Sequence, residues 1–360
     1  MKEFLPENAV APKLLDWFDT FGRHDLPWQK QKTAYRVWLS EIMLQQTQVK
    51  TVIDYFHRFI ARFPNVKALA TANSNEVLQL WAGLGYYARA RNLHRTAQII
   101  HQDYHGRFPR TVTELEQFPG IGRSTAGAIV AIACGIKATI LDGNVKRVLS
   151  RILTLSGTPL DKTFNDTLWK VAENLTPSER VGDYTQAIMD LGATLCTRTK
   201  PRCTECPLQS LCSAYQLDRV ADFPNAKIKK VRPERDVHLI LLENSQQQIL
   251  LHQRPDSGIW GGLWCLPEVA EKEAILPWCR QNRMPKTTLQ YTFEPIKHIL
   301  THFTLYLHVH YVSCNASQIK SPHATIGAWH SRLELNTMGF PAPIQKLLKR
   351  HFDDKNRTLR

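Results

Sequence analysis

The sequence predicts two folded domains, an α-helical one over residues 1–225 and an α+β one over residues 233–352. The chain has 360 residues, of which 43% are hydrophobic and 22% charged, as expected for a globular protein with two cores. Up to about residue 225, apolar residues recur with helical spacing, whereas further on they alternate with polar ones, as in half-buried strands. Residues 226–232 are basic and lie where the period changes, so we expect a linker there and a tail over residues 353–360.

The helical period is strong in three segments of the first domain. Each has one apolar face, formed by Leu14, Leu15, Trp17 and Phe18, by Val49, Val52, Ile53 and Phe56, or by Ala126, Ile129, Val130 and Ala133. In the second domain, the odd positions of residues 303–311 are apolar and the even ones are mostly polar, which predicts a strand.

The charge balance favours a polyanionic partner. The chain carries 46 Lys and Arg against 32 Asp and Glu, a formal charge of +14. It has no apolar signal segment near its start and no apolar run long enough to span a membrane. We therefore expect a reducing compartment, the bacterial cytoplasm with access to the nucleoid. We also expect the protein to be a monomer.

Four cysteines, Cys196, Cys203, Cys206 and Cys212, stand in a Cys-x6-Cys-x2-Cys-x5-Cys run. Thiolates select iron–sulfur clusters or zinc, and four of them close a coordination shell, which indicates a structural centre. Zinc usually binds two short Cys knuckles, but here one knuckle is flanked by single cysteines. The spacing therefore favours a [4Fe-4S] cluster and leaves zinc open. Arg198, Lys200 and Arg202 between the first two cysteines are suited to phosphate contacts.

Residues 115–126 predict a hairpin between two helices. Pro119 and Gly120 suit a tight turn, Gly122 allows a ligand close to the backbone, and Ser124 and Thr125 are able to cap the next helix. Free amides at such a helix start bind anions such as a DNA phosphate. In isolation, a simple capped loop explains the pattern equally well.

Two carboxylates are candidates for catalysis. Glu41 shares the face of an apolar helix with Trp38 and Leu44, where its pKa should be raised, and this suits a general acid. Asp142 follows a second apolar run at a turn that opens the next helix. Taken alone, Glu41 is more often a partly exposed helix residue and Asp142 more often a helix N-cap.

The motifs together resemble the adenine DNA glycosylases, the MutY branch of the endonuclease III-like superfamily. The resemblance covers nearly the whole chain and is carried, in the family's order, by residues 38–49, 84–90, 118–122 and 141–148 and by the four-cysteine run. Residues 258–268 resemble the family's MutT/Nudix-like domain. The resemblance implies a helix-hairpin-helix glycosylase domain with a [4Fe-4S] loop, followed by a recognition domain.

The activity implied by the resemblance is removal of adenine mispaired with 8-oxoguanine, or with guanine, in duplex DNA. The adenosine must be flipped out of the stack before any side chain reaches it. Glu41 would then protonate the base and help to activate water, and Asp142 would stabilise the oxocarbenium-like sugar electrostatically or trap it covalently. Asn144 would orient the site.

The resemblance also implies residues that contact the DNA. Gln46 and Tyr86 would enter the stack near 8-oxoguanine, with Gln45 and Thr47 nearby. Weaker candidates for the adenine pocket, which core packing and capping explain about as well, are Trp28, Gln29 and Gln186.

Ser124 stands where strand-cutting relatives carry a lysine that forms a Schiff base. Because a hydroxyl cannot form that imine, we expect a monofunctional glycosylase with little or no lyase activity.

In the second domain, no Arg-Glu-x2-Glu-Glu run follows Glu268, so pyrophosphatase chemistry is disfavoured and lesion recognition is expected. Residues 298–303 align with a Phe-Ser-His segment of relatives, with Leu300 and Thr301 in place of Phe and Ser and with His302 retained. The strand period also places His302, His308 and His310 on one face, which we expect to be solvated or to face DNA rather than to bind a metal.

Two other functions remain open. One is a DNA-binding protein without catalysis that uses its cluster for redox sensing or scans for lesions, which the intact Glu41 and Asp142 argue against. The other is a thymine or oxidised-pyrimidine glycosylase of the same fold, which the MutT-like domain disfavours.

Overall fold

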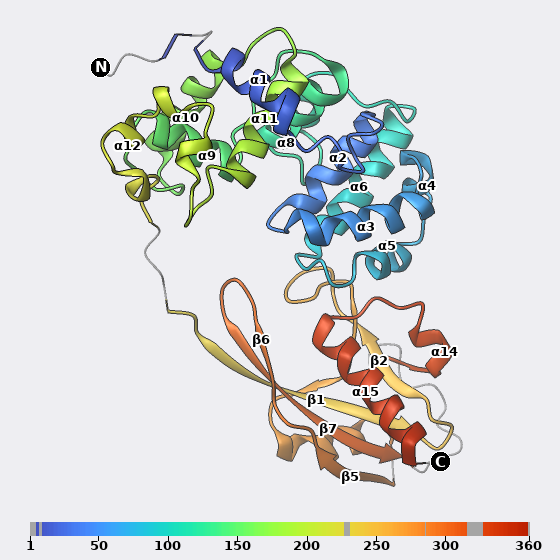
Figure 1. Cartoon of the computed structure of the whole chain (residues 1–360). Helices are drawn as coiled ribbons and strands as arrows, with labels where there is room; N and C mark the ends of the chain where they lie inside the picture. The colour runs from blue at the N-terminus through green and yellow to red at the C-terminus, as the bar shows by residue number, and fades with distance from the viewer. Residues whose placement is uncertain (1–4, 7–8, 227–230, 285, 315–326, 359–360) are drawn as a thin grey trace. The chain divides into compact units, whose positions relative to one another are not determined.

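The computed structural model describes residues 5–6, 9–226, 231–284, 286–314 and 327–358 (Figure 1). It divides into two compact units: unit 1 is Met1–Thr71 with Asn92–Lys229, and unit 2 is Ala72–Arg91 with Lys230–Arg360. Residues 227–230 of the expected linker lie outside the described residues.

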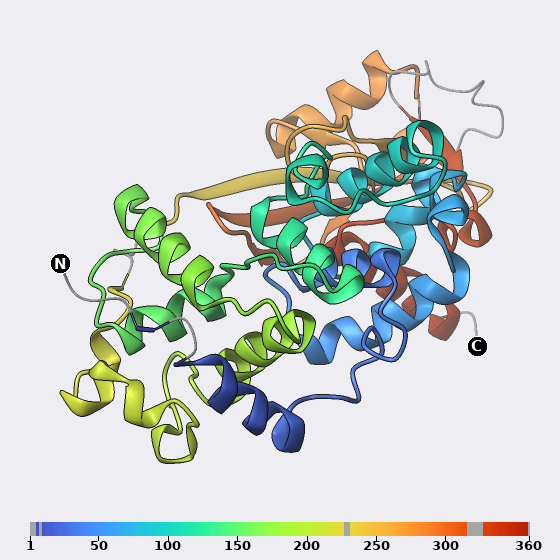
Figure 2. The same ribbon diagram turned by 90° about the horizontal axis from the view of Figure 1, so that it is seen from above.

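Every described element of unit 1 is a helix or a helical turn, as the two views show (Figures 1 and 2). The helices are α1 (Ala11–Phe21), α2 (Ala34–Leu44), α3 (Val49–Arg62), α4 (Val66–Ala70), α6 (Ala88–Asp103, which begins in unit 2), α7 (Val112–Leu115), α8 (Arg123–Ala128), α9 (Gly143–Ile152), α10 (Lys162–Leu175), α11 (Val181–Thr194) and α12 (Ser213–Gln216). Three 3₁₀ turns, η2 (Cys203–Glu205), η3 (Gln209–Leu211) and η4 (Val220–Asp222), carry the cysteine region and the segment after it.

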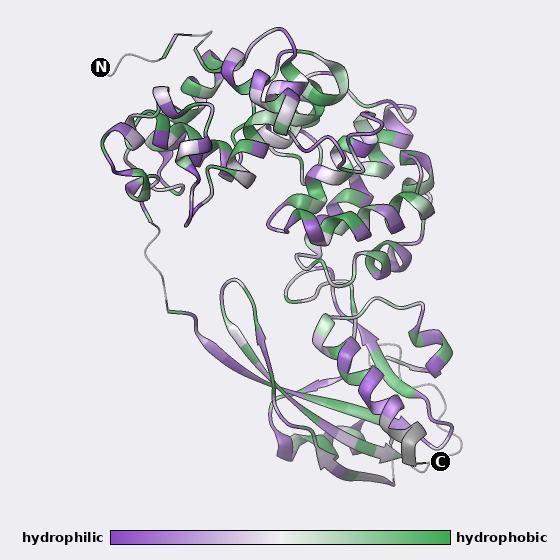
Figure 3. Ribbon diagram, viewed as in Figure 1, coloured by the Kyte–Doolittle hydropathy of each residue, from purple (hydrophilic) through white to green (hydrophobic). Residues whose placement is uncertain are grey.

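Amphipathic helices build the core of unit 1. Hydrophobic and hydrophilic residues alternate along single helices (Figure 3), and the apolar faces of α1, α9, α10 and α11 share one core that includes Leu14, Val148, Leu168 and Ile188. The predicted helix around Ala126–Ala133 forms, but its second half winds as a π-helical turn, η1 (Ile129–Ala133). Such turns occur often at functional sites.

Unit 2 is built on a mixed sheet. Its strands are β1 (Glu234–Asn244), β2 (Ile249–Gln253), β3 (Trp264–Cys265), β4 (Glu268–Val269), β5 (Thr287–Thr292), β6 (Ile296–Ile299), β7 (Thr304–Cys314) and β8 (Ala328–His330). The main strand order is β3-β2-β1-β7-β5, with β1 and β7 parallel and the other pairs antiparallel.

Two helices pack on this sheet. Helix α13 (Ile275–Gln281) covers the face that carries Ile240 and Val312. Helix α15 (Ala342–Thr358) is tied to the other face by a buried hydrogen bond of 2.9 Å between His351 Nε2 and Glu243 Oε2. The segment after β1 also contains helix α14 (Arg332–Leu335) and the turn η5 (Lys272–Ala274). The expected tail therefore begins as helix up to Thr358, and residues 359–360 are not described.

Residues 72–91 have a helical period, so the sequence predicts that they belong to the first domain. The structure groups them with unit 2 instead. They contain α5 (Ser74–Trp81) and the loop with Tyr86. Their contacts to the sheet domain are specific: Arg91 Nη1 donates to Gly261 O at 2.6 Å, and Gln253 Nε2 donates to Asn75 Oδ1 at 2.8 Å.

The strand predicted over 303–311 is β7, in which residues 305, 307 and 309 are buried as expected. The prediction of one solvated histidine face is wrong. His302 precedes the strand and is exposed, whereas His310 is buried and lies 3.0 Å from His238 and 2.9 Å from the Thr292 hydroxyl. His310 shares a strand face with Val312 and Cys314, which pack in a core with residues of α13, so the even positions of β7 are buried from His310 on.

Candidate active site

Glu41 lies in α2, which packs against α3, α8 and η1. Its residue surface is only half-buried, but its carboxyl group is enclosed by protein. This burial raises the pKa of Glu41 from 4.5 to about 8, and the nearby negative charge of Asp142 adds to the effect. The structure thus brings together the two carboxyl groups that the sequence singles out.

Asp142 is the N-cap of α9. Val145 N donates to Asp142 Oδ1 at 2.8 Å, and Asn144 Nδ2 donates to Oδ2 at 3.2 Å. Burial raises the pKa of Asp142, but these hydrogen bonds and the charge of Arg147 oppose the rise. No comparable interaction from the described residues lowers the Glu41 pKa. The hydrogen-bond donors therefore favour the anion at Asp142 and leave Glu41 as the member of the pair that holds a proton more readily.

Arg147 connects this pair to the cysteine region. Its Nη2 donates to Asn144 Oδ1 at 2.9 Å and to Gly192 O at 2.7 Å, while its Nε donates to Cys196 O at 2.8 Å. The sequence prediction missed Arg147, although a cation within a buried helix face is a usable signal.

The hairpin before α8 has the predicted turn. Gly120 has a φ of +82°, and a Cβ placed there would lie 2.9 Å from the Cβ of Asn92, so the turn requires glycine. Gly122 is the N-cap of α8 and makes no side-chain cap, so the predicted capping by Ser124 and Thr125 is wrong. Ser124 Oγ instead accepts from Leu141 N at 3.1 Å, one residue before Asp142.

Two expected DNA-contacting residues have a strained backbone. Gln46 is exposed with a φ of 56°, and Tyr86 is 45% exposed with a φ of 50°. Non-glycine residues in this region are uncommon and concentrate at functional sites. Beside Gln46, the Thr47 hydroxyl donates to Gln45 O at 3.4 Å. In unit 2, the Tyr86 hydroxyl lies 2.8 Å from Thr301 Oγ1.

The three adenine-pocket candidates differ in their surroundings. Trp28 is buried and packs edge-on against Phe56 with ring centroids 5.5 Å apart, which is core packing. The Nε2 atom of Gln29 is buried and has no hydrogen-bond partner in the described part of the chain. Gln186 is buried, and its Nε2 donates to Asp190 Oδ1 at 2.8 Å.

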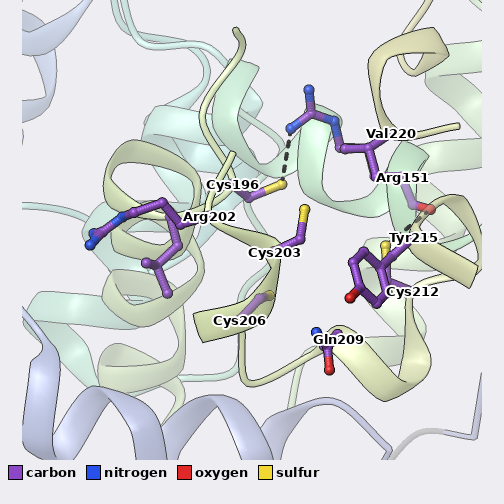
Figure 4. Close-up of a pocket in the computed structure, with 10 residues that line it drawn as sticks. Arg151, Cys196, Arg202, Cys203, Cys206, Gln209, Cys212, Tyr215 and Val220 are labelled. Atoms are coloured by element: carbon purple, nitrogen blue, oxygen red, sulfur yellow. Dashed lines mark hydrogen bonds between the residues drawn. The ribbon is translucent and has the colours of Figure 1, made fainter. Parts of the chain in front are cut away.

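The four cysteines line one pocket (Figure 4), together with Arg151, Leu195, Arg202, Gln209, Tyr215 and Val220. Buried Arg151 donates from Nη1 to Cys196 Sγ at 3.3 Å and to Thr197 O at 2.7 Å. Its other nitrogens donate to Arg198 O and Phe223 O, whereas Arg202 pairs at the surface with Glu205. In the described ranges, no three His, Cys, Asp or Glu side chains could hold a single metal ion.

Comparison with known proteins decides the family. Residues 39–174 match the model of the HhH-GPD superfamily of base excision DNA repair proteins, and residues 238–350 match the NUDIX domain. The adenine DNA glycosylase of Buchnera aphidicola from Acyrthosiphon pisum is 39% identical over 93% of this chain and 95% of its own length. The chain belongs to the adenine DNA glycosylase family. The human adenine DNA glycosylase is 34% identical over 95% of this chain and 74% of its own length.

The fold agrees with this assignment. A solved thermostable thymine-DNA glycosylase, 27% identical, superposes with a TM-score of 0.51 over 57% of this chain and 95% of its own. As a member of the adenine DNA glycosylase family, the chain is an enzyme of base excision repair that acts on adenine in DNA. Within the described residues, no helix is both long and apolar enough to cross a membrane.

Proposed function

We propose that the chain removes adenine mispaired with 8-oxoguanine, and with guanine, by hydrolysing the glycosidic bond without cutting the strand. The observation that carries this proposal is the buried carboxyl pair, in which Glu41, with its pKa raised to about 8, lies beside Asp142, whose carboxylate accepts from Val145 N and Asn144 Nδ2. Acid and anion are the two groups that glycoside hydrolysis requires.

The reaction uses these two groups in sequence. Once the adenosine is flipped out, Glu41 donates its proton to N7 of adenine, and the bond between C1′ and N9 breaks with its electrons leaving on the base. The Asp142 carboxylate stabilises the positive sugar, and water adds to C1′ while Glu41 accepts the water's proton. Asn144 holds Asp142 in place.

Ser124 supports the monofunctional part of the proposal. It offers no amine for an imine with C1′, and its hydroxyl already accepts the Leu141 N–H next to Asp142. Its role is to hold the turn that carries the catalytic carboxylate.

Lesion reading is assigned to Gln45, Gln46 and Thr47 in unit 1 and to Tyr86, Thr301 and His302 in unit 2. The hydrogen bond between Tyr86 and Thr301 supports this, because Thr301 supplies the hydroxyl that a serine supplies in relatives. Gly120 and Gly122 are assigned to a DNA phosphate, since among the described residues a Cβ placed at Gly122 would meet open space beyond its own turn.

The cysteine pocket suits a [4Fe-4S] cluster. A tetrahedral zinc site needs four thiolate sulfurs about 3.8 Å from one another. Among the described residues, no three potential ligands are placed so that they could hold one ion, which disfavours zinc. A cluster takes one cysteine per iron and so accepts a wider set of sulfurs. Cys196, Cys203, Cys206 and Cys212 would hold it, Arg151 would donate to the Cys196 sulfur, and the bound cluster would cross-link the loop that carries Arg198 and Lys200.

The test is single-turnover excision on labelled duplexes with adenine opposite 8-oxoguanine, guanine or cytosine, each divided into alkali-treated and untreated halves. We expect cleavage only after alkali, fastest opposite 8-oxoguanine. Strand cleavage without alkali, with an adduct that borohydride traps, would refute the monofunctional mechanism. Equal rates opposite 8-oxoguanine and cytosine would refute the lesion specificity.

A further inference from the structure

Arg89 is a buried cation that the mechanism above does not use. It lies in the first turn of α6, and only 8% of its surface is exposed. Burial lowers the pKa of its guanidinium to about 10, so the group stays charged at neutral pH. A buried charge is costly unless the groups around it stabilise it, so its contacts indicate what it holds in place.

The Arg89 guanidinium holds the loop that precedes α6. Its Nη2 donates to Leu84 O at 3.0 Å and to Gly85 O at 3.2 Å. Two neighbouring carbonyl oxygens that meet at one donor repel each other, and a positive charge on that donor offsets the repulsion. Trp81 Nε1 also donates to Gly85 O, at 3.2 Å. The guanidinium therefore ties both carbonyls to the start of α6.

The same guanidinium lies over two aromatic rings. Its Cζ is 5.3 Å from the centre of the Trp81 ring and 5.5 Å from the centre of the Tyr86 ring. Such contacts between a cation and a ring are stronger where the cation is desolvated. Because the two carbonyls fix the cation, the cation in turn restricts where the Tyr86 ring can lie.

Tyr86 needs this support. Its φ of 50° is in the left-handed region, which is unfavourable for a residue with a side chain and persists only where the surroundings hold it. The hydroxyl of the ring lies 2.8 Å from Thr301 Oγ1. Arg89 thus acts on the backbone before Tyr86 and on its ring, while Thr301 acts on its hydroxyl.

We propose that Arg89 is a positioning residue that holds the Tyr86 ring in place before DNA binds, so that the ring reaches the lesion without rearrangement of its loop. The proposal rests on the proposed function, in which Tyr86 takes part in lesion reading. A side chain that is already fixed in its bound conformation loses no further conformational entropy on binding. Arg89 needs no contact with DNA for this role.

Two measurements on Arg89→Met test the proposal. Methionine is a flexible apolar side chain that supplies neither a donor nor a charge. Hydrogen exchange of the DNA-free protein, read from a peptide that spans residues 82–88, should become about tenfold faster. The ratio of single-turnover excision rates for adenine opposite 8-oxoguanine and opposite guanine should fall about tenfold, the effect of one lost hydrogen bond. An unchanged exchange rate or an unchanged ratio would overturn the proposal.

Two further substitutions show whether the charge is needed and whether it acts through Tyr86. Arg89→Lys restores a cation that is able to donate to both carbonyls, so its ratio and its exchange rate should lie within about threefold of wild type. Tyr86→Leu should lower the ratio alone, and adding Arg89→Met to it should lower the ratio no further. A ratio in Arg89→Lys as low as in Arg89→Met, or a further fall in the double variant, would overturn the proposal.

The matched control is Arg95→Met, which removes the same charge from an exposed position of α6 and should change neither the exchange rate nor the ratio. Equilibrium binding of an undamaged duplex separates positioning from a direct phosphate contact. We expect Arg89→Met to bind this duplex within about twofold of Arg95→Met. Binding weaker than that of the control by about tenfold or more would assign Arg89 to the DNA backbone and overturn the proposal.

The proposal and the proposed function fail in different measurements. If the wild-type protein shows no preference for 8-oxoguanine, the proposed function is refuted, whereas the exchange rates still test whether Arg89 holds the loop. If Arg89→Met does not fold, Arg89→Gln, which keeps a donor but no charge, takes its place. Its ratio should lie below that of Arg89→Lys, and equal ratios in these two variants would overturn the proposal.

Discussion

Glu41 and Asp142 carry the same chemical group in different surroundings. Asp142 receives N–H donors from Val145 and Asn144, whereas burial and the charge of its neighbour act on Glu41 in the same direction. Local sequence places each of them on a helix or at a cap, but it cannot show that they meet. The division between acid and anion arises from tertiary structure.

Keeping Glu41 buried should cost folding stability at neutral pH. Its folded pKa of about 8 lies above the ordinary value of 4.5, so the folded state retains a proton that the unfolded chain releases, and stability falls as pH rises from 4.5 to 8. Glu41→Gln removes this cost, and we expect it to raise the free energy of unfolding by about 3 kcal/mol more at pH 8 than at pH 5.

Urea unfolding at the two pH values measures this difference. The control is Glu116→Gln, which changes an exposed glutamate after α7 and should have the same small effect at both pH values. A Glu41→Gln variant that gains no stability between pH 5 and pH 8 would show that its carboxyl is not held protonated.

At the scale of elements, the local apolar period predicts which segments form helices and strands, but not which residues meet across the fold. The helices of unit 1 and strand β7 follow from apolar spacing, and the cap of α9 follows from Asp142. The burial of His310 does not follow, because it depends on the packing of α13 over the end of β7 that carries Val312 and Cys314. The Arg23–Asp190 contact joins positions 167 residues apart, which no local pattern indicates.

Arg151 should be essential to the cysteine region. Arg151→Met removes the donor to Cys196 Sγ and leaves three carbonyls without their partner, that of Phe223 buried and those of Thr197 and Arg198 partly buried, so we expect a loss of about 3 kcal/mol in stability. We also expect less iron per chain, measured by visible absorbance and metal analysis. The matched control, Arg202→Met, loses one exposed ion pair worth under about 1 kcal/mol and should keep its iron. Equal iron content in the two variants would refute this role of Arg151.

His310 should make unit 2 sensitive to acid. Burial, with the charges of His238 (β1), Lys272 (η5) and His308 (β7), lowers its pKa from 6.5 to about 4, against the opposing charge of Glu273. Because the unfolded chain binds the proton first as pH falls, stability is lost between pH 6.5 and 4, by about 2 kcal/mol at pH 5.

Hydrogen exchange of the β1 and β7 amides at pH 7 and pH 5, corrected for intrinsic rates, measures this loss. His310→Gln should abolish the pH dependence, whereas His302→Gln, at an exposed site, should retain it. If His310→Gln retained the full pH dependence, a titratable group other than His310 would have to cause the loss of stability in acid.

At the scale of the whole molecule, the two units do not coincide with a simple division of the sequence. The helical period of residues 72–91 predicts a helix but does not indicate which hydrophobic core the helix joins. In the structure, Tyr87 OH donates to Phe340 O, and a Cβ at Gly262 would lie 3.2 Å from Leu78, both within unit 2. Deleting residues 233–360 would therefore uncover this segment as well as remove Thr301.

A point substitution separates lesion reading from that loss of packing. Thr301→Val removes the hydroxyl that meets Tyr86, and we expect it to lower the preference for adenine opposite 8-oxoguanine over guanine by about tenfold. Single-turnover rates on the two duplexes measure the preference. Thr288→Val, at an exposed position of β5, is the control and should keep it. An unchanged preference in Thr301→Val would remove Thr301 from lesion reading.

The most direct test of the central claim compares wild type with Glu41→Gln on one duplex, with adenine opposite 8-oxoguanine, measuring binding and single-turnover excision side by side. The account predicts a dissociation constant within about twofold of wild type and an excision rate lowered at least a hundredfold to ten-thousandfold, the range for a lost general acid. Excision by Glu41→Gln at a rate near that of wild type would contradict it, because the buried acid would then not be the group that releases the base.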